Sequence, residues 1–425
     1  MPKKIFNIFE NYWKALGPGL TTGAADDDPS GIATYSQTGA KYGLNMIWLA
    51  LFTFPLMAIV QEMCARIGLV TGAGLAYNIK RNYSKKVLFI CALLLLSANI
   101  FNIGADLGAM AQGVRLVFPH LNFALLVIIF AVFCLVLQIF ISYKKYSKYL
   151  KYLTFVLFAY VFAVFVIQID WFQVLKHTFI PNIHISKDSL ILICAILGTT
   201  ISPYLFFWQT SQEVEEYSLI PQSAEGISSD LDIKNDIKKM RADVWSGMFF
   251  SNVVMFFIIL TCASTLFKNG ITNITTATDA AYALRPLAGN FTFILFAIGI
   301  VGTGLLAIPV LAGSVSYAVS EFFGWKEGLY RNWREALAFY GVIILAVGFG
   351  ILLNFIGLDS IKALIYSAML NGLVAPIIIF LILGLSSNEK IMGEYKNSKL
   401  IKFFGWILFL LMTLVGITTI ISLWF

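Results

Sequence analysis

The sequence predicts an all-α protein that crosses a membrane many times. Of its 425 residues, 59% are hydrophobic and only 12% are charged, and the mean hydropathy is +0.81. This composition is that of a polytopic membrane protein. The apolar residues form long runs separated by short charged connections. We therefore expect residues 1–425 to form a single transmembrane domain, with no soluble domain attached.

Eleven runs are long enough to cross a hydrocarbon core of about 30 Å. They lie near residues 13–40, 45–69, 86–112, 122–143, 150–169, 188–217, 241–267, 291–321, 335–356, 360–384 and 401–424. With the N-terminus in the cytoplasm, 23 of the 30 Lys and Arg residues fall on the cytoplasmic side. Such a bias orients membrane proteins, so it supports both the number of spans and this orientation. We expect a multi-pass protein of the plasma membrane. The longest cytoplasmic connection would be the polar loop 218–240.

The first span carries three successive carboxylates, Asp26, Asp27 and Asp28, followed by Pro29. A charged residue at mid-membrane costs about 2.5–3.5 kcal/mol on insertion scales, so three of them persist only where they face water, protein or a cation. Pro29 has no backbone donor and clashes with the preceding turn, which leaves carbonyl groups free before it. A helix broken in this way is tolerated at membrane depth only where it lines a site.

The sixth span is interrupted in the same way. Residues 198–204 place a glycine, three hydroxyl side chains and Pro203 in the middle of an apolar run. If spans 1–5 (about 13–169) and 6–10 (about 188–384) are two halves, both breaks fall on the first helix of a half. That is the pattern of a transporter built from two inverted five-helix repeats, here with an eleventh helix at about 401–424. The alternative is that Pro203 only kinks its helix, and the matching positions favour a site.

Several motifs, in chain order, resemble the Nramp family of divalent-metal transporters. Asp28-Pro29-Ser30-Gly31 resembles the Asp-Pro-Gly-Asn hallmark of that family's first helix. Residues 65–72 are similar to its second helix, and Gly104-Ala105-Asp106 to its third. The resemblance implies an eleven-helix, LeuT-like fold and a secondary transporter that moves metal ions by alternating access.

The resemblance also implies a metal site shared by the two breaks. The family holds its metal with an Asp and an Asn of the first helix, and with a Met thioether and a carbonyl of the sixth. In this chain Asp28 keeps the Asp, Gly31 stands at the Asn and Ser202 at the Met. The residues expected at the metal are Ala25, Asp27, Asp28, Gly31, Thr199 and Ser202.

These departures from the family pattern favour hard cations. A thioether favours softer transition metals, whereas carboxylate, hydroxyl and carbonyl oxygens suit Mg²⁺ and Mn²⁺. Gly31 and Ser202 also leave more space, and Mg²⁺ usually keeps several waters. We therefore expect Mg²⁺ and Mn²⁺ to be carried partly hydrated, and the combination resembles the Nramp-related magnesium transporters.

Proton coupling is not expected from the sequence. Tyr204 and Gln209 stand at the two histidines of the family's sixth helix, and Ala109 replaces an acid one turn after Asp106. Tyrosine and glutamine do not titrate near neutral pH as histidine does. The polar groups expected along the path or beside the ligands are Asp106, Tyr204, Gln209, Glu213 and Asn371. We expect Glu213 in a hydrated inner vestibule, and the alternative is a gating salt bridge.

Two alternative functions remain open, and several classes are excluded. The chain could be a proton-coupled Mn²⁺/Fe²⁺ transporter of the ordinary Nramp type, or an amino-acid or amine symporter on the same fold. Three carboxylates would repel the carboxylate of an amino acid. The sequence contains no catalytic triad and no phosphate loop, so we expect no enzyme. We also expect no cofactor besides the transported ion, no nucleic-acid partner, and a monomer or weak oligomer.

Overall fold

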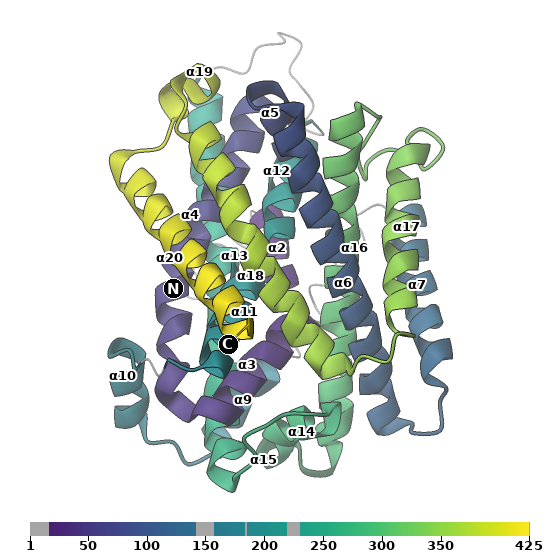
Figure 1. The fold of residues 1–425 in the computed structure, drawn as a ribbon, viewed down its shortest axis with the longest axis vertical. Helices are drawn as coiled ribbons and strands as arrows, with labels where there is room; N and C mark the ends of the chain where they lie inside the picture. The colour runs from purple at the N-terminus through teal and green to yellow at the C-terminus, as the bar shows by residue number, and fades with distance from the viewer. Residues whose placement is uncertain (1–16, 142–156, 183–184, 219–229, 425) are drawn as a thin grey trace, which may run out of the picture.

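The computed structural model describes residues 17–141, 157–182, 185–218 and 230–424, which form a bundle of long helices (Figure 1). No β-strand occurs among these residues. Eight helical segments within them are long and apolar enough to cross a membrane. The predicted all-α membrane architecture is confirmed.

The helices follow the expected order along the chain. They are α2 (Pro18–Asp26), α3 (Pro29–Tyr42), α4 (Trp48–Thr71), α5 (Leu75–Asn82), α6 (Lys85–Val117), α7 (Phe123–Phe140), α9 (Phe158–Val166), α10 (Trp171–Phe179), α11 (Lys187–Thr200), α12 (Pro203–Ser218), α13 (Asp230–Thr265), α14 (Ala277–Ala281), α15 (Arg285–Ala288), α16 (Thr292–Phe323), α17 (Leu337–Leu353), α18 (Ser360–Ser386), α19 (Glu389–Met392) and α20 (Lys399–Trp424). Each of the eleven expected runs contains helix. Residues 13–16, 142–143 and 150–156 of the expected first, fourth and fifth runs, and residues 219–229 of the expected loop 218–240, lie outside the described residues.

The expected loop 218–240 is partly wrong, because α13 begins at Asp230. Ile233, Ile237 and Met240 recur at the spacing of one helical face. Ile237 and Met240 are buried and Ile233 packs against the core. Hydropathy alone did not predict these first helical turns of α13, because the opposite face of the helix carries charged residues.

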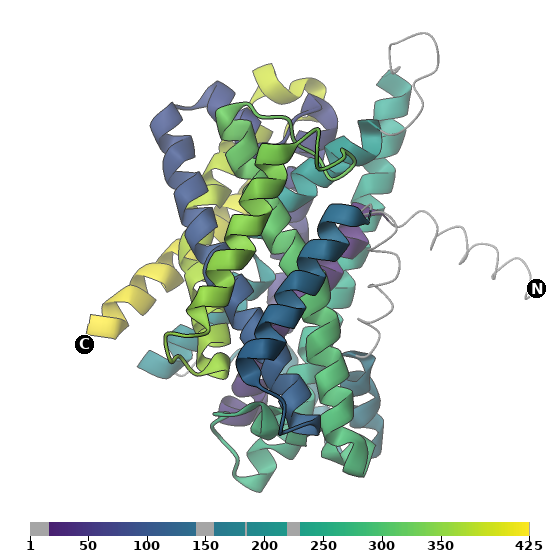
Figure 2. The ribbon, with the colours of Figure 1, turned by 90° about the vertical axis from the view of Figure 1, so that its right-hand side faces the viewer.

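The short helices mark the two ends of the bundle. Figure 1 shows α5 and α19 at one end, here called the α5 end, and α10, α14 and α15 at the other, here called the α14 end. Helices α6, α7, α16 and α17 pack against one another along one side of the bundle (Figures 1 and 2). The half-length helices α2, α3, α11 and α12 are packed among the long ones.

Glycine allows α2 to approach α13 closely. Gly19 and Gly23 have the GxxxG spacing that brings membrane helices together. A Cβ atom at Gly19 would lie 2.6 Å from the backbone of Val244, and one at Gly23 would collide with the backbone of Gly247. The carboxylate of Asp243 on α13 also accepts hydrogen bonds from the first amides of α2, at 2.6–3.2 Å, which satisfies donors that a helix start leaves unpaired.

The connection between α16 and α17 gathers carboxylates at the α5 end. Glu215 accepts hydrogen bonds from the Tyr317 hydroxyl and from the Leu329 amide, the latter at 2.7 Å. Glu321 accepts one from the Tyr77 amide at 2.6 Å. Burial, together with repulsion by Glu321 and Glu215, raises the pKa of Glu327 to about 9.

This pKa predicts how stability depends on pH. Because the pKa of Glu327 is higher in the folded protein than in the unfolded chain, stability falls as pH rises between the two values. We expect Glu327→Gln to raise the unfolding temperature by about 2–4 °C in mildly alkaline buffer and by less in mildly acidic buffer. Thermal unfolding in detergent measures the difference, and Glu335→Gln, exposed in the same connection, is the control. A difference that does not grow with pH would contradict the prediction.

Candidate metal site

The first span breaks where the sequence predicts. Helix α2 ends at Asp26 and α3 begins at Pro29. Asp28 caps α3: its Oδ1 accepts hydrogen bonds from the Gly31 amide at 2.8 Å and from the Ser30 hydroxyl at 2.6 Å. An aspartate in this position satisfies a donor that the helix start leaves free. The same residue therefore both ends the break and presents a carboxylate there.

The sixth span breaks between Thr200, the last residue of α11, and Pro203, the first of α12. The Ser202 hydroxyl donates to the carbonyl oxygens of Gly198 at 2.6 Å and Thr199 at 2.8 Å. These carbonyls would otherwise be unpaired at the helix end. The hydroxyl oxygen of Ser202 keeps its lone pairs, so it can still accept or bind a cation.

The three carboxylates of the first break face two different helices, α13 and α6. Ser251 on α13 donates to Asp26 Oδ2 at 2.5 Å and to Asp27 Oδ1 at 3.3 Å. Asn102 on α6 donates through Nδ2 to Asp28 Oδ2 at 2.9 Å. All three aspartates are at most 3% exposed. Asp27 and Asp28, which we expect at one ion, therefore lie on different sides of the break.

Polar groups from α6 and α18 surround Asp28. Asn102 Oδ1 accepts a hydrogen bond from the Ser367 hydroxyl at 2.7 Å. One turn further along each helix are Asp106 and Asn371, both buried, whose side-chain polar atoms have no hydrogen-bond partner among the described residues. Asp106 interacts electrostatically with Asp28.

The sequence reasoning missed Asn102 and Ser367. The available signal for Asn102 was a polar residue one turn before Asp106, inside an apolar span and on the same helix face. Ser367 had a comparable position, one turn before Asn371. A single sequence did not reveal that these two faces meet at Asp28.

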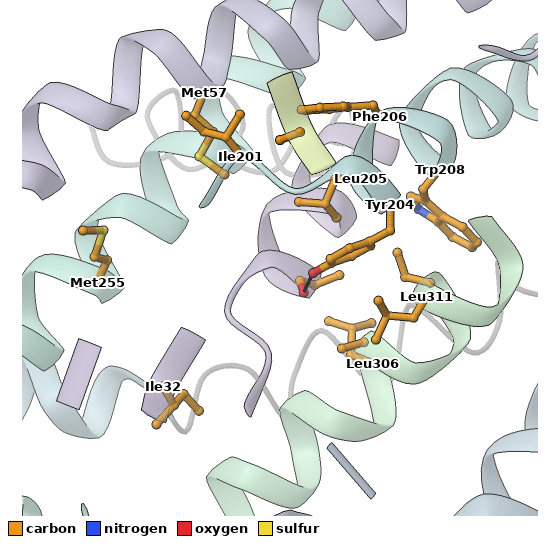
Figure 3. Close-up of a cluster of buried hydrophobic side chains, with 14 of the residues drawn as sticks. Ile32, Met57, Ile201, Tyr204, Leu205, Phe206, Trp208, Met255, Leu306 and Leu311 are labelled. Atoms are coloured by element: carbon orange, nitrogen blue, oxygen red, sulfur yellow. Dashed lines mark hydrogen bonds between the residues drawn. The ribbon is translucent and has the colours of Figure 1, made fainter. Parts of the chain in front are cut away.

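The two breaks approach each other at Gly31. A Cβ atom at Gly31 would lie 3.1 Å from Thr199 Oγ1 and 3.3 Å from the Asp26 carbonyl oxygen. Close by, the Tyr204 hydroxyl donates to the Ala25 carbonyl at 3.2 Å. Figure 3 shows Tyr204 among apolar side chains of α12 and α16, including Leu205, Trp208, Leu306 and Leu311. The expected residues Ala25, Gly31 and Thr199 therefore do lie at the junction of the two breaks.

Glu213 does not lie in a hydrated vestibule, which corrects our expectation. Its side chain is 5% exposed and accepts a hydrogen bond from Gln209 Nε2 at 2.8 Å. Gln209 in turn accepts one from Thr22 on α2 at 2.5 Å. Helix α2 therefore packs against α12 at this level, and this packing buries Glu213.

A cavity opens on the opposite side of the break. It has a volume of about 250 Å³ and begins one turn beyond Asp28. Its lining residues come from α3, α6, α14, α16 and α18 and from the segment before α14: Ile32, Ala33, Ala109, Gln112, Leu116, Thr275, Thr276, Ala277, Thr278, Ala280, Phe296, Ile300, Asp359, Ser360, Ile361 and Leu364. Within the described residues, this cavity therefore lies between the first break and the α14 end.

Charge around the break is not balanced by basic side chains. No Lys or Arg in the described parts of the chain forms an ion pair with Asp26, Asp27, Asp28 or Asp106. Nor do three His, Cys, Asp or Glu side chains converge there to hold a metal. An ion at the break would therefore need neutral oxygens or water in addition to a carboxylate.

Proteins similar in sequence are known. "Divalent metal cation transporter MntH" of Clostridium acetobutylicum is 26% identical over 418 residues, covering 95% of this chain and 90% of the relative. The protein of the same name from Bacillus subtilis is 25% identical over 418 residues, covering 96% and 92%. The family described as "Natural resistance-associated macrophage protein-like" matches residues 19–422.

Solved structures share the fold. The Eremococcus coleocola manganese transporter, in complex with an aromatic bis-isothiourea substituted compound, has a TM-score of 0.76 at 19% identity, covering 98% of this chain and 88% of that one. Mhp1 in its inward-facing conformation has a TM-score of 0.55 at 13% identity, covering 96% and 90%. The two broken helices and these neighbours identify a LeuT-like fold, as expected. Since the family match spans nearly the whole chain, this protein belongs to the Nramp family.

Proposed function

We propose that this protein transports divalent metal cations across the membrane by alternating access, with Mg²⁺ and Mn²⁺ as its ions. One observation carries the proposal: three buried carboxylates, Asp26, Asp27 and Asp28, lie at the first helix break and a fourth, Asp106, lies one turn beyond Asn102 on α6, and none of them has a basic partner among the described residues. Burying an unpaired charge is costly. A transported cation would compensate this charge.

The groups at the junction support a hard ion. Asp28, Thr199 and Ser202 offer carboxylate and hydroxyl oxygens, and Ala25 offers a carbonyl. None of these is a soft ligand, and oxygen ligands suit Mg²⁺ and Mn²⁺. The space expected at Gly31 is taken up by Thr199 Oγ1 and the Asp26 carbonyl, which would lie 3.1 Å and 3.3 Å from a Cβ there. A partly hydrated ion would therefore have to bind beside Asp28, and Asp27 would act through water. The relatives named as divalent metal or manganese transporters support the broader class of substrate.

Transport without proton coupling is the second part of the proposal. Tyr204 and Gln209 both form hydrogen bonds with neutral groups of α2. The Tyr204 hydroxyl donates to the Ala25 carbonyl, and the Gln209 side chain accepts from the Thr22 hydroxyl. Neither side chain exchanges a proton near neutral pH. A proton-coupled Mn²⁺/Fe²⁺ transporter is the alternative, and the buried Asp106, which makes no hydrogen bond in the described structure, favours it.

Liposomes separate these two mechanisms. Proteoliposomes loaded with a pH-sensitive dye, with the membrane potential clamped, receive Mg²⁺ or Mn²⁺ outside. We expect metal uptake without acidification of the lumen, because no group at Tyr204 or Gln209 can carry a proton. Protein-free liposomes are the control. Acidification that scales with metal uptake and disappears in Asp106→Asn would instead establish proton coupling through Asp106.

We also propose the orientation in a plasma membrane. The α5 end carries many basic side chains, and Lys234 on α13 pairs there with Glu394 at 3.6 Å. Basic residues are enriched on the cytoplasmic side, so the α5 end and the N-terminus would face the cytoplasm. The cavity at the α14 end would then receive ions from outside. An amino-acid symporter is disfavoured because the carboxylates of the break would repel its substrate.

A further inference from the structure

We propose that Asn102 is a ligand of the transported ion, supplying from α6 the amide that the first span lacks at Gly31. The proposal rests on the proposed function, because it assumes that the ion binds at Asp28. It adds a residue from a third helix to a site that the sequence assigns to the two broken spans.

The contacts of Asp28 support this role. Its two carboxylate oxygens accept hydrogen bonds from different sides. Oδ1 accepts from the Gly31 amide and the Ser30 hydroxyl, and Oδ2 accepts from Asn102 Nδ2 at 2.9 Å. Asn102 is completely buried. Among the described residues, Asn102 is the residue whose side-chain amide contacts the Asp28 carboxylate. Gly31, at the position of the family's asparagine, has no side chain that could bind an ion.

The neighbours of Asn102 allow its amide to reverse. In the structure its N–H points at Asp28, and its Oδ1 accepts a hydrogen bond from the Ser367 hydroxyl. An N–H cannot face a cation at Asp28, but a rotation of the amide would present Oδ1, an oxygen ligand that hard cations accept. The Ser367 hydroxyl also lies 2.7 Å from the Leu364 carbonyl. It could therefore donate there while accepting from the rotated Asn102.

A second observation places unpaired carboxylate oxygens near Asn102. Asp106 lies one turn from Asn102 on the same face of α6. It is completely buried, and neither of its oxygens has a hydrogen-bond partner in the described structure. A cation bound between Asp28 and Asn102 would supply a positive group near these unpaired oxygens.

Isothermal titration of the purified full-length protein with Mn²⁺ and with Mg²⁺ tests the proposal. We expect Asn102→Ala to weaken binding by about tenfold or more, which corresponds to about 1.4 kcal/mol. The matched control is Asn99→Ala. Asn99 is equally buried one turn earlier on α6, but it bonds to the Leu311 carbonyl and the Ser314 hydroxyl. We expect this variant to bind like the parent.

Asn102→Asp distinguishes a ligand from a residue that only holds Asp28 in place. An aspartate keeps a side-chain oxygen but has no N–H to donate to Asp28. If Asn102 is a ligand, this variant should therefore bind the metal ion as tightly as the parent or more tightly. If the N–H that holds Asp28 is what matters, this variant should lose binding as Asn102→Ala does, and the proposal is wrong. This comparison also decides the matter if the alanine variant does not fold.

The same titrations separate this proposal from the proposed function. Parent-like binding by Asn102→Ala, together with loss of binding by Asp28→Asn, would overturn the role of Asn102 and leave the ion site at Asp28 intact. Parent-like binding by Asp28→Asn would overturn both.

Discussion

Asp28→Asn is expected to reduce Mg²⁺ and Mn²⁺ transport by about a hundredfold or more, the equivalent of roughly 2.7 kcal/mol of ion binding. Asparagine keeps the shape of the side chain and one oxygen. That oxygen can still accept from the Gly31 amide and cap α3, so the protein should fold. The negative charge, however, is lost at a position that is 1% exposed, and no Lys or Arg among the described residues forms an ion pair with it.

Uptake into proteoliposomes with a metal-sensitive dye measures this effect, and titration calorimetry measures binding. The matched control is Asp188→Asn at the start of α11. Asp188 is exposed and pairs with Lys41 at 2.6 Å, and exposed pairs contribute little. Near-normal uptake by Asp28→Asn would remove the basis of the proposed function.

Ser202→Met combined with Gly31→Asn is expected to shift ion preference from Mg²⁺ toward Mn²⁺, Fe²⁺ and Cd²⁺. The thioether restores a soft ligand, and the asparagine restores an amide in the first span. A Cβ at Gly31 meets Thr199 Oγ1 at 3.1 Å, so Thr199 must move by a few tenths of an ångström. The substitution of Ser202 also removes the hydroxyl that donates to the Gly198 and Thr199 carbonyls at the end of α11, which should lower the stability of the folded protein.

Calorimetric titration with Cd²⁺ and Mg²⁺ tests the shift, with an expected change in their affinity ratio of at least about tenfold. Ser202→Ala is the control, because it removes the hydroxyl without adding sulfur. If the folded double variant binds Cd²⁺ no better than the parent, Ser202 and Gly31 do not face the ion.

The sequence by itself determined the spans and their two breaks. Long apolar runs must form helices in a bilayer, since every backbone group has to be paired within the protein. Pro29 and Pro203 interrupt those helices wherever the chain folds, because proline lacks the donor of the helical hydrogen bond. These effects act over a few residues, so they can be read without knowing the neighbours.

Only the tertiary structure decided what each polar side chain faces. A helical repeat tells which residues share a face, but not which distant helix covers that face. Asp26, Asp27 and Asp28 are adjacent in sequence, yet the first two bond to Ser251 on α13 and the third to Asn102 on α6. Glu213 is buried and Asn102 meets Ser367 for the same reason. These contacts join residues far apart in the chain, and they exist only because the helices pack in this one arrangement.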